Sequence, residues 1–244
     1  MVQRTSRRRR FRRGAGAALV LGLCVGAAGL ALWLNHRDIA GPRQSAQPST
    51  TSFPPDAQQA RNMLNALTVA WNDHWDSYAR NAFGPGWAGR GGEPRLAGEC
   101  TARDVVLRRD LREIKAAQRN PCIVLSGVVD DPYSGIRLSY NRFKAGDIEI
   151  DHLVALGDAW RSGAWAWPDE QRERFANDVD NLLVVRKQAN QDKGSKSPDR
   201  WRPRPEYWCE YGKRWVAVKS RYGLHVTPPE RDALTQLLDA CPAP

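Results

Sequence analysis

Hydrophobic and polar positions divide the chain into three stretches of different character. The first is an uninterrupted run from Gly14 to Leu34, twenty-one residues without a charged side chain. At about 1.5 Å per residue, a helix of this length spans ~30 Å, which is enough to cross a bilayer. Asp38 to Asp56 are rich in Pro, Ser, Thr, Gln and Ala, a composition typical of a flexible tether. From Ala57 onward, apolar residues recur at the spacings of helices and strands, which predicts a folded domain.

The residues around the apolar run indicate export. Seven arginines and no acid precede it, and such a basic flank predicts that the N-terminus stays in the cytoplasm. A cleaved signal peptide usually has an apolar core of ~7–15 residues that ends in small residues, whereas this run is longer and ends in Leu32-Trp33-Leu34. We therefore favour an uncleaved anchor, with a cleaved, secreted form as the alternative. The expected segments are a basic cytoplasmic arm (1–13), the anchor or signal peptide (14–34), a flexible linker (35–56) and the folded domain (57–244).

Apolar periodicity predicts two helices at the start of the folded domain. In the first, which begins near Ala57, apolar residues recur every three or four positions and form one stripe: Leu64, Leu67, Trp71, Trp75 and Tyr78. His74 lies off this stripe and is expected on the surface. Thr101 is a suitable N-cap for the second helix, which is expected to run to about Gln118.

Strand-like segments follow in two pairs. Cys122 to Val129 and Gly135 to Tyr140 are joined by turn-forming residues, which predicts a β-hairpin. A strand beginning at Ile148 and a second strand at Leu182 to Val185 form the other pair, followed by a polar helix that ends before Gly194. Further helices are predicted at Gly157 to Ala164, Pro168 to Asn177 and Pro229 to Ala240.

Charge changes this picture little, whereas the cysteines add a constraint. Beyond residue 13, 30 basic side chains face 27 acidic ones, so the net charge of +10 is weak support for nucleic-acid binding by the folded part. Four cysteines lie outside the apolar run, and none forms a C-x-x-C zinc motif. An exported chain favours disulfides. Of three possible pairings, we favour Cys100–Cys122 and Cys209–Cys241, each closing a local loop around a helix and stabilising the fold by ~3 kcal/mol.

The second strand pair and its helix carry the residues with chemical potential. Asp151 and His152 end the first strand, Asn181 precedes the second strand, and Asn190 lies on the helix. A neutral His is a natural general base, and carboxylate and amide oxygens suit Mg²⁺ or Mn²⁺. On a regular strand, the side chains of Asp151 and His152 would diverge, so a local bend must let both reach one substrate.

These motifs resemble a known nuclease family. Asp-His after an apolar strand, then Asn-Leu-Leu-x-Val, then Asn-x-x-Lys-Gly nine residues beyond the first Asn, is similar to HNH endonucleases, also called His-Me finger or ββα-metal nucleases. Segments such as Asp131-Pro-Tyr-Ser-Gly135 and Lys196-Ser-Pro-Asp-Arg-Trp201 resemble an exported bacterial branch related to the nuclease domain of modification-dependent restriction enzymes. The resemblance covers roughly residues 60–241.

The resemblance implies a fold and a set of roles. The expected fold is α+β, a ββα-metal core with flanking helices and a β-hairpin, preceded by one membrane-spanning helix. The implied roles are His152 as general base, Asp151 and Asn190 as ligands of one Mg²⁺ or Mn²⁺, and Asn181 as the residue that holds the loop and the His. Many HNH proteins end the motif in His; Asn190 in that place favours a hard metal over zinc. Lys193 and Lys196 stand where they could contact phosphate.

The resulting prediction is a metal-dependent endonuclease acting outside the cytoplasm, on DNA more than on RNA. Taken singly, each of these residues also has a purely structural interpretation, as a buried polar pair or a turn residue. One alternative is a non-catalytic, membrane-anchored envelope protein that binds nucleic acid or another partner. Another is a metal-dependent hydrolase of a different phosphodiester.

Overall fold

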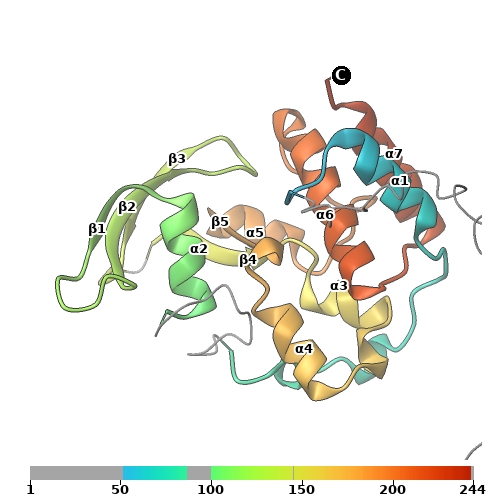
Figure 1. The fold of residues 1–244 in the computed structure, drawn as a ribbon, viewed down its shortest axis with the longest axis horizontal. Helices are drawn as coiled ribbons and strands as arrows, with labels where there is room; N and C mark the ends of the chain where they lie inside the picture. The colour runs from blue at the N-terminus through green and yellow to red at the C-terminus, as the bar shows by residue number, and fades with distance from the viewer. Residues whose placement is uncertain (1–51, 87–99, 145, 243–244) are drawn as a thin grey trace, which may run out of the picture. The chain divides into compact units, whose positions relative to one another are not determined.

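A computed structural model describes residues 52–86, 100–144 and 146–242. The predicted basic arm, the apolar run and most of the linker lie outside the described residues. Within those ranges, no helix is both long and apolar enough to cross a membrane. The described chain is a mixed α+β structure, as predicted, with two small sheets and several helices (Figure 1).

The candidate site lies on two antiparallel strands and the helix that directly follows the second strand. These elements are β4 (Ile148–His152), β5 (Leu182–Arg186) and α5 (Lys187–Lys193). The helix packs against both strands and ends at Gly194, whose φ of 51° lies in the left-handed region that glycine adopts most easily. All three elements agree with the sequence prediction.

β5 separates two hydrophobic cores, because the side chains of a strand point alternately to opposite faces. Leu182 and Val184 belong to one core, and Leu183 and Val185 belong to the other. All four side chains are buried. β4, which pairs with β5 along its whole length, therefore lies at the boundary between the two halves.

The first core lies between a helix and a three-stranded antiparallel sheet. The elements are α2 (Ala102–Asp110), β1 (Arg112–Ala116), β2 (Val124–Asp130) and β3 (Arg137–Asn141). The β2–β3 hairpin confirms the prediction, as does Thr101, which caps α2 together with Asp104. The predicted extent of α2 to Gln118 is wrong. Residues after Asp110 pair with β2 instead, and Glu113 adopts a φ of 53°, which is incompatible with a continuing helix.

The second core is mainly helical and contains α1 (Ala57–Ala66), α6 (Trp208–Tyr222) and α7 (Pro228–Asp239). The apolar stripe predicted for the first helix is wrong beyond Ala66. Val69 forms a parallel bridge with Val226, and this long-range pairing takes the backbone out of the helical path. As a result Trp71 and Trp75 are 72% and 49% exposed rather than buried.

Four short elements connect β4 to β5. They are α3 (Leu156–Arg161), η3 (Ala164–Ala166), α4 (Asp169–Ala176) and η4 (Val179–Asn181). α3 and α4 agree with the two predicted helices to within a few residues. The remaining short turns are η1 (Trp75–Ser77), η2 (Arg80–Phe83) and η5 (Pro205–Tyr207).

Two disulfides join the pairs of cysteines that the sequence favoured. Cys100 is linked to Cys122, with the Cα atoms 5.2 Å apart. Cys209 is linked to Cys241, with the Cα atoms 4.7 Å apart. The first closes a loop that contains α2 and β1, and the second ties the start of α6 to the end of α7.

Candidate active site

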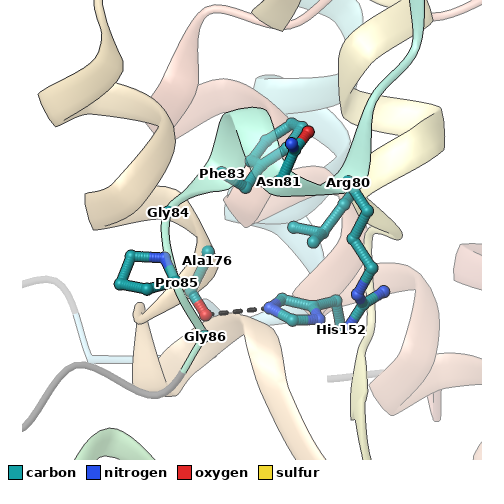
Figure 2. Close-up of a pocket in the computed structure, with 9 residues that line it drawn as sticks. Arg80, Asn81, Phe83, Gly84, Pro85, Gly86, His152 and Ala176 are labelled. Atoms are coloured by element: carbon teal, nitrogen blue, oxygen red, sulfur yellow. Dashed lines mark hydrogen bonds between the residues drawn. The ribbon is translucent and has the colours of Figure 1, made fainter.

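His152, at the end of β4, is 8% exposed and held in one orientation. Its Nε2 atom lies 2.8 Å from the carbonyl oxygen of Ala176, the last residue of α4 (Figure 2). A carbonyl oxygen only accepts, so Nε2 carries the proton, and Nδ1 of the neutral ring is the nitrogen with a basic lone pair. Burial lowers the pKa of His152 to about 4, and the charges of Arg80 and Lys193 act in the same direction. The ring is therefore neutral near pH 7, as a general base must be.

Asn181 is fully buried and fixes the backbone directly after His152. Its side-chain oxygen accepts from the Val154 amide at 2.8 Å, and its side-chain nitrogen donates to the Val154 carbonyl at 3.1 Å. Its own carbonyl accepts from the Leu153 amide at 2.8 Å. These three bonds are what a residue that positions the His-bearing strand end would make, and none of them reaches a substrate.

Asp151 is buried among protein partners. Its carboxylate accepts from the Tyr133 hydroxyl at 2.7 Å and lies 2.9–3.0 Å from the ammonium of Lys193. Lys193 is also buried and donates to the His152 carbonyl at 2.9 Å. Burial raises the pKa of Asp151, against the charge of Lys193, which lowers it. The predicted phosphate contact of Lys193 stays a prediction, since the contacts of its ammonium here are with Asp151 and His152.

Asn190, on α5, approaches the same strand from the helix side. Its side-chain nitrogen donates to Glu149 at 2.8 Å, which leaves its amide oxygen as an acceptor. Glu149 and Asp151 are two residues apart on β4 and therefore share a face of the strand. Glu149 is half-buried and orients Asn190.

One cavity brings three of the predicted site residues together. Asp151, His152 and Asn190 line the same space of about 220 Å³. Two of these residues offer oxygen atoms: the carboxylate of Asp151 and the side-chain amide oxygen of Asn190. Within the described ranges, no group of three or more His, Cys, Asp or Glu could hold a metal ion. A carboxylate offers about four acceptor positions, so Asp151 retains capacity beyond Tyr133 and Lys193. A hard divalent cation held by Asp151 and Asn190 and completed by water stays a prediction.

Arg80 is a site residue without a sequence signal. It lies on η2, about seventy residues before the Asp-His pair, and lines the cavity at Asp151. It also lines a second cavity of about 420 Å³ on the Ala176 side of His152. Figure 2 shows its side chain reaching toward the imidazole. Arg80 and His152 come together only in the folded chain, because they are far apart in the sequence.

Lys196 lies outside the cavity that contains Asp151. Its side chain is exposed, and its ammonium donates to the Asp192 carbonyl at 2.6 Å. It follows Ser195, which does line that cavity. The phosphate contact expected of Lys196 stays a prediction. Its position next to Ser195 is compatible with such a contact.

Comparison with known proteins places this chain with nuclease-related domains. Residues 101–237 match the family described as GmrSD restriction endonucleases, C-terminal domain, and the chain belongs to this family. It is also 38% identical over 202 residues to an "Uncharacterized secreted protein" of Arthroderma benhamiae, which covers 80% of this chain and 93% of that protein. No solved structure matches the chain.

Proposed function

We propose that this protein is a metal-dependent endonuclease of the HNH (His-Me finger) type. The observation that carries the proposal is the environment of His152: a buried, neutral imidazole oriented by the Ala176 carbonyl. It ends the first strand of a strand–strand–helix unit. It shares a cavity with Asp151 and Asn190, the two residues with suitable oxygen donors. Membership of a restriction-endonuclease family supports the same conclusion.

The chemistry assigned to the chain's residues is phosphodiester hydrolysis. The Nδ1 atom of His152 accepts the proton of the attacking water, while the bond from Nε2 to Ala176 keeps the ring oriented. Asp151 and Asn190 would hold one Mg²⁺ or Mn²⁺, which supplies charge neutralisation at the phosphate and the leaving oxygen. Asn181 positions the strand end. Asp151 and His152 line one cavity although they are consecutive on a strand.

The substrate is a nucleic acid, and DNA is favoured because the family is named for restriction endonucleases. The place of action is outside the cytoplasm. Two features support it: the relative from Arthroderma benhamiae is named a secreted protein, and two disulfides close the fold, a bond type that persists in oxidising compartments.

The test is cleavage by the purified protein, measured on plasmid, linear DNA and RNA with Mg²⁺, Mn²⁺ or EDTA. Cleavage should require the metal, and His152→Ala should lower its rate by ~10²–10⁴-fold, the usual share of a general base. His74→Ala is the matched control, because His74 lines neither cavity at His152, and it should cut at the wild-type rate. Cleavage that persists in EDTA, or an unaffected His152→Ala variant, would sink the proposal. Binding without cleavage would indicate the non-catalytic alternative.

A further inference from the structure

A third cavity lies next to the candidate site. It measures about 340 Å³, within the range of roughly 300–1,000 Å³ typical of binding pockets. Ser195 lines both this cavity and the one at Asp151 and His152, so the two adjoin. We propose that this cavity, called the strand groove below, binds one unpaired nucleic-acid strand next to the scissile phosphate. The inference rests on the proposed function. Its lining includes Trp71, Arg161, Ser195, Lys196, Asp199 and Arg200.

The junction at Ser195 is shaped by close packing. The Arg161 guanidinium donates to the Ser195 carbonyl at 2.6 Å and lies over the Trp75 ring at 4.9 Å. A Cβ atom at Gly157 would lie 2.6 Å from the Ser195 hydroxyl oxygen and 3.1 Å from Trp75. Only glycine at position 157 therefore leaves room for Ser195 where the two cavities meet.

The charge of the strand groove suits a phosphate backbone. Its lining contains three cations, Arg161, Lys196 and Arg200, and one acid, Asp199. Asp199 already accepts from the Ser197 hydroxyl at 2.5 Å and lies 3.4 Å from Arg200. The Arg200 side chain is 77% exposed, and the Lys196 ammonium has two donors beyond its bond to Asp192. Cations with unused donors attract phosphates.

Trp71 gives the strand groove an aromatic wall. It is 72% exposed, an unfavourable place for a large apolar ring. Its backbone is nonetheless held on both sides: the Ala70 amide donates to Val226, and the Asp73 amide donates to Arg161. An exposed indole on a held backbone, beside cations, is the arrangement that proteins use to stack unpaired bases while the nucleic-acid backbone follows the positive charge. A base inside a duplex has both faces covered by its neighbours, so this arrangement selects a single strand.

The experiment measures binding apart from cleavage. The full-length chain carrying His152→Ala is titrated in EDTA against a fluorescein-labelled single strand and the matched duplex, and anisotropy reports binding. Trp71→Ala should weaken single-strand binding about tenfold and change duplex binding less than twofold. Trp71→Phe keeps a stacking ring and should retain most of the affinity. Trp165→Ala is the control, an exposed tryptophan that stacks on His74 and lines none of the three cavities.

Salt dependence tests the cations in the same assay. Lys196→Ala and Arg200→Ala should each lower the slope of log K against log salt by about 0.7 for a single strand. Lys115→Ala, an exposed cation on β1, should leave it unchanged. The strand-groove proposal would be overturned if Trp71→Ala bound the single strand as tightly as Trp165→Ala. It would also be overturned if the parent protein showed no preference for the single strand. If the wild-type chain cleaves nucleic acid but Trp71→Ala does not change binding, only the strand groove is rejected. If binding depends on Trp71 but the wild-type chain does not cleave, only the nuclease proposal is rejected.

Discussion

Two buried lysines in this protein make almost the same contacts and lie in different surroundings. The Lys193 ammonium lies within 3.0 Å of Asp151 and of the His152 carbonyl. The Lys219 ammonium lies within 3.0 Å of Asp158, of Glu230 and of the His225 carbonyl. Both lysines are 0% exposed. A buried lysine–carboxylate pair therefore does not by itself mark an active site.

The surroundings make the difference. Asp151, the partner of Lys193, also lines a cavity with a neutral histidine and an amide oxygen. The partners of Lys219 point into the helical core, where Glu230 also accepts from the Trp215 indole at 2.7 Å and completes the cap of α7. The Lys193 cluster borders a cavity, whereas the Lys219 cluster joins α3, α6 and α7. The predictions below separate these two roles.

The largest effect is expected from removing either ammonium. Lys193→Met removes the buried cation beside Asp151, and Lys219→Met removes the one beside Asp158 and Glu230. Breaking a buried ion pair in this way typically costs ~3–5 kcal/mol of stability. Mg²⁺ should recover part of this loss for Lys193→Met, because a cation at Asp151 takes over the role of the ammonium. It should recover none for Lys219→Met. Chemical denaturation with and without Mg²⁺ measures both, and an equal response of the two variants would contradict the distinction.

The next effect concerns metal affinity. Asp151→Ala and Asn190→Ala should weaken Mn²⁺ binding at least ~10-fold, since even partners that only orient a ligand usually contribute 10–100-fold. Asn181→Ala should weaken metal binding less, because its contacts are with the backbone at Val154. Calorimetric titration with Mn²⁺ ranks the three variants. A larger loss for Asn181→Ala than for Asn190→Ala would reverse the proposed roles.

A smaller effect is a pH dependence of stability that arises in the cluster around Lys219. Burial raises the pKa of Glu230 to about 7, and the charge of Asp158 adds to the rise while Lys219 opposes it. Between the ordinary pKa of 4.5 and about 7, the folded protein thus binds more protons than the unfolded chain. This group makes stability fall as pH rises through that interval.

Glu230→Gln should therefore flatten the fall in stability by an amount on the order of 1–2 kcal/mol. Glutamine can still cap α7, and Asp158 still pairs with Lys219. Denaturation midpoints from pH 4.5 to 8 provide the measurement, with the exposed Glu170→Gln as control. Parallel curves for wild type and Glu230→Gln would refute the assignment.

The smallest effect is expected at Tyr133. Tyr133→Phe removes the hydrogen bond to Asp151 and leaves the ring in its aromatic cluster with Trp201 and Tyr211. The loss should be about 1 kcal/mol of stability and a few-fold in cleavage rate, because Lys193 still holds the carboxylate. Tyr207→Phe is a suitable control from the same cluster, and thermal unfolding and cleavage rates of the two variants decide the point.

Sequence patterns predicted those parts of the fold that depend on residues close together in the chain. β4, β5, α5 and the β2–β3 hairpin were predicted because their apolar periods, turn residues and Gly194 are contiguous in sequence. The pairing of the four cysteines followed from loop closure in the same way. Asp151, His152 and Asn190 could be singled out together because their spacing places them on adjoining elements.

The failures have a long-range cause in each case. The helical stripe through Trp71 and Trp75 ends because Val69 pairs with Val226, more than 150 residues away. The predicted end of α2 gives way to pairing with β2. Arg80 reaches His152 only through the tertiary fold. No window of sequence around any of these residues contains its partner.

The position of β5 between two cores has a consequence for assembly. Because a strand has a period of two, a shift of one residue in its pairing would exchange the side chains offered to the two halves. The same shift would move Leu182 away from His152. We therefore expect the arrangement around His152 to form only after both halves have closed in the correct register. One disulfide ties each half, Cys100–Cys122 beside α2 and Cys209–Cys241 between α6 and α7, so an incompletely oxidised chain should be a poor nuclease.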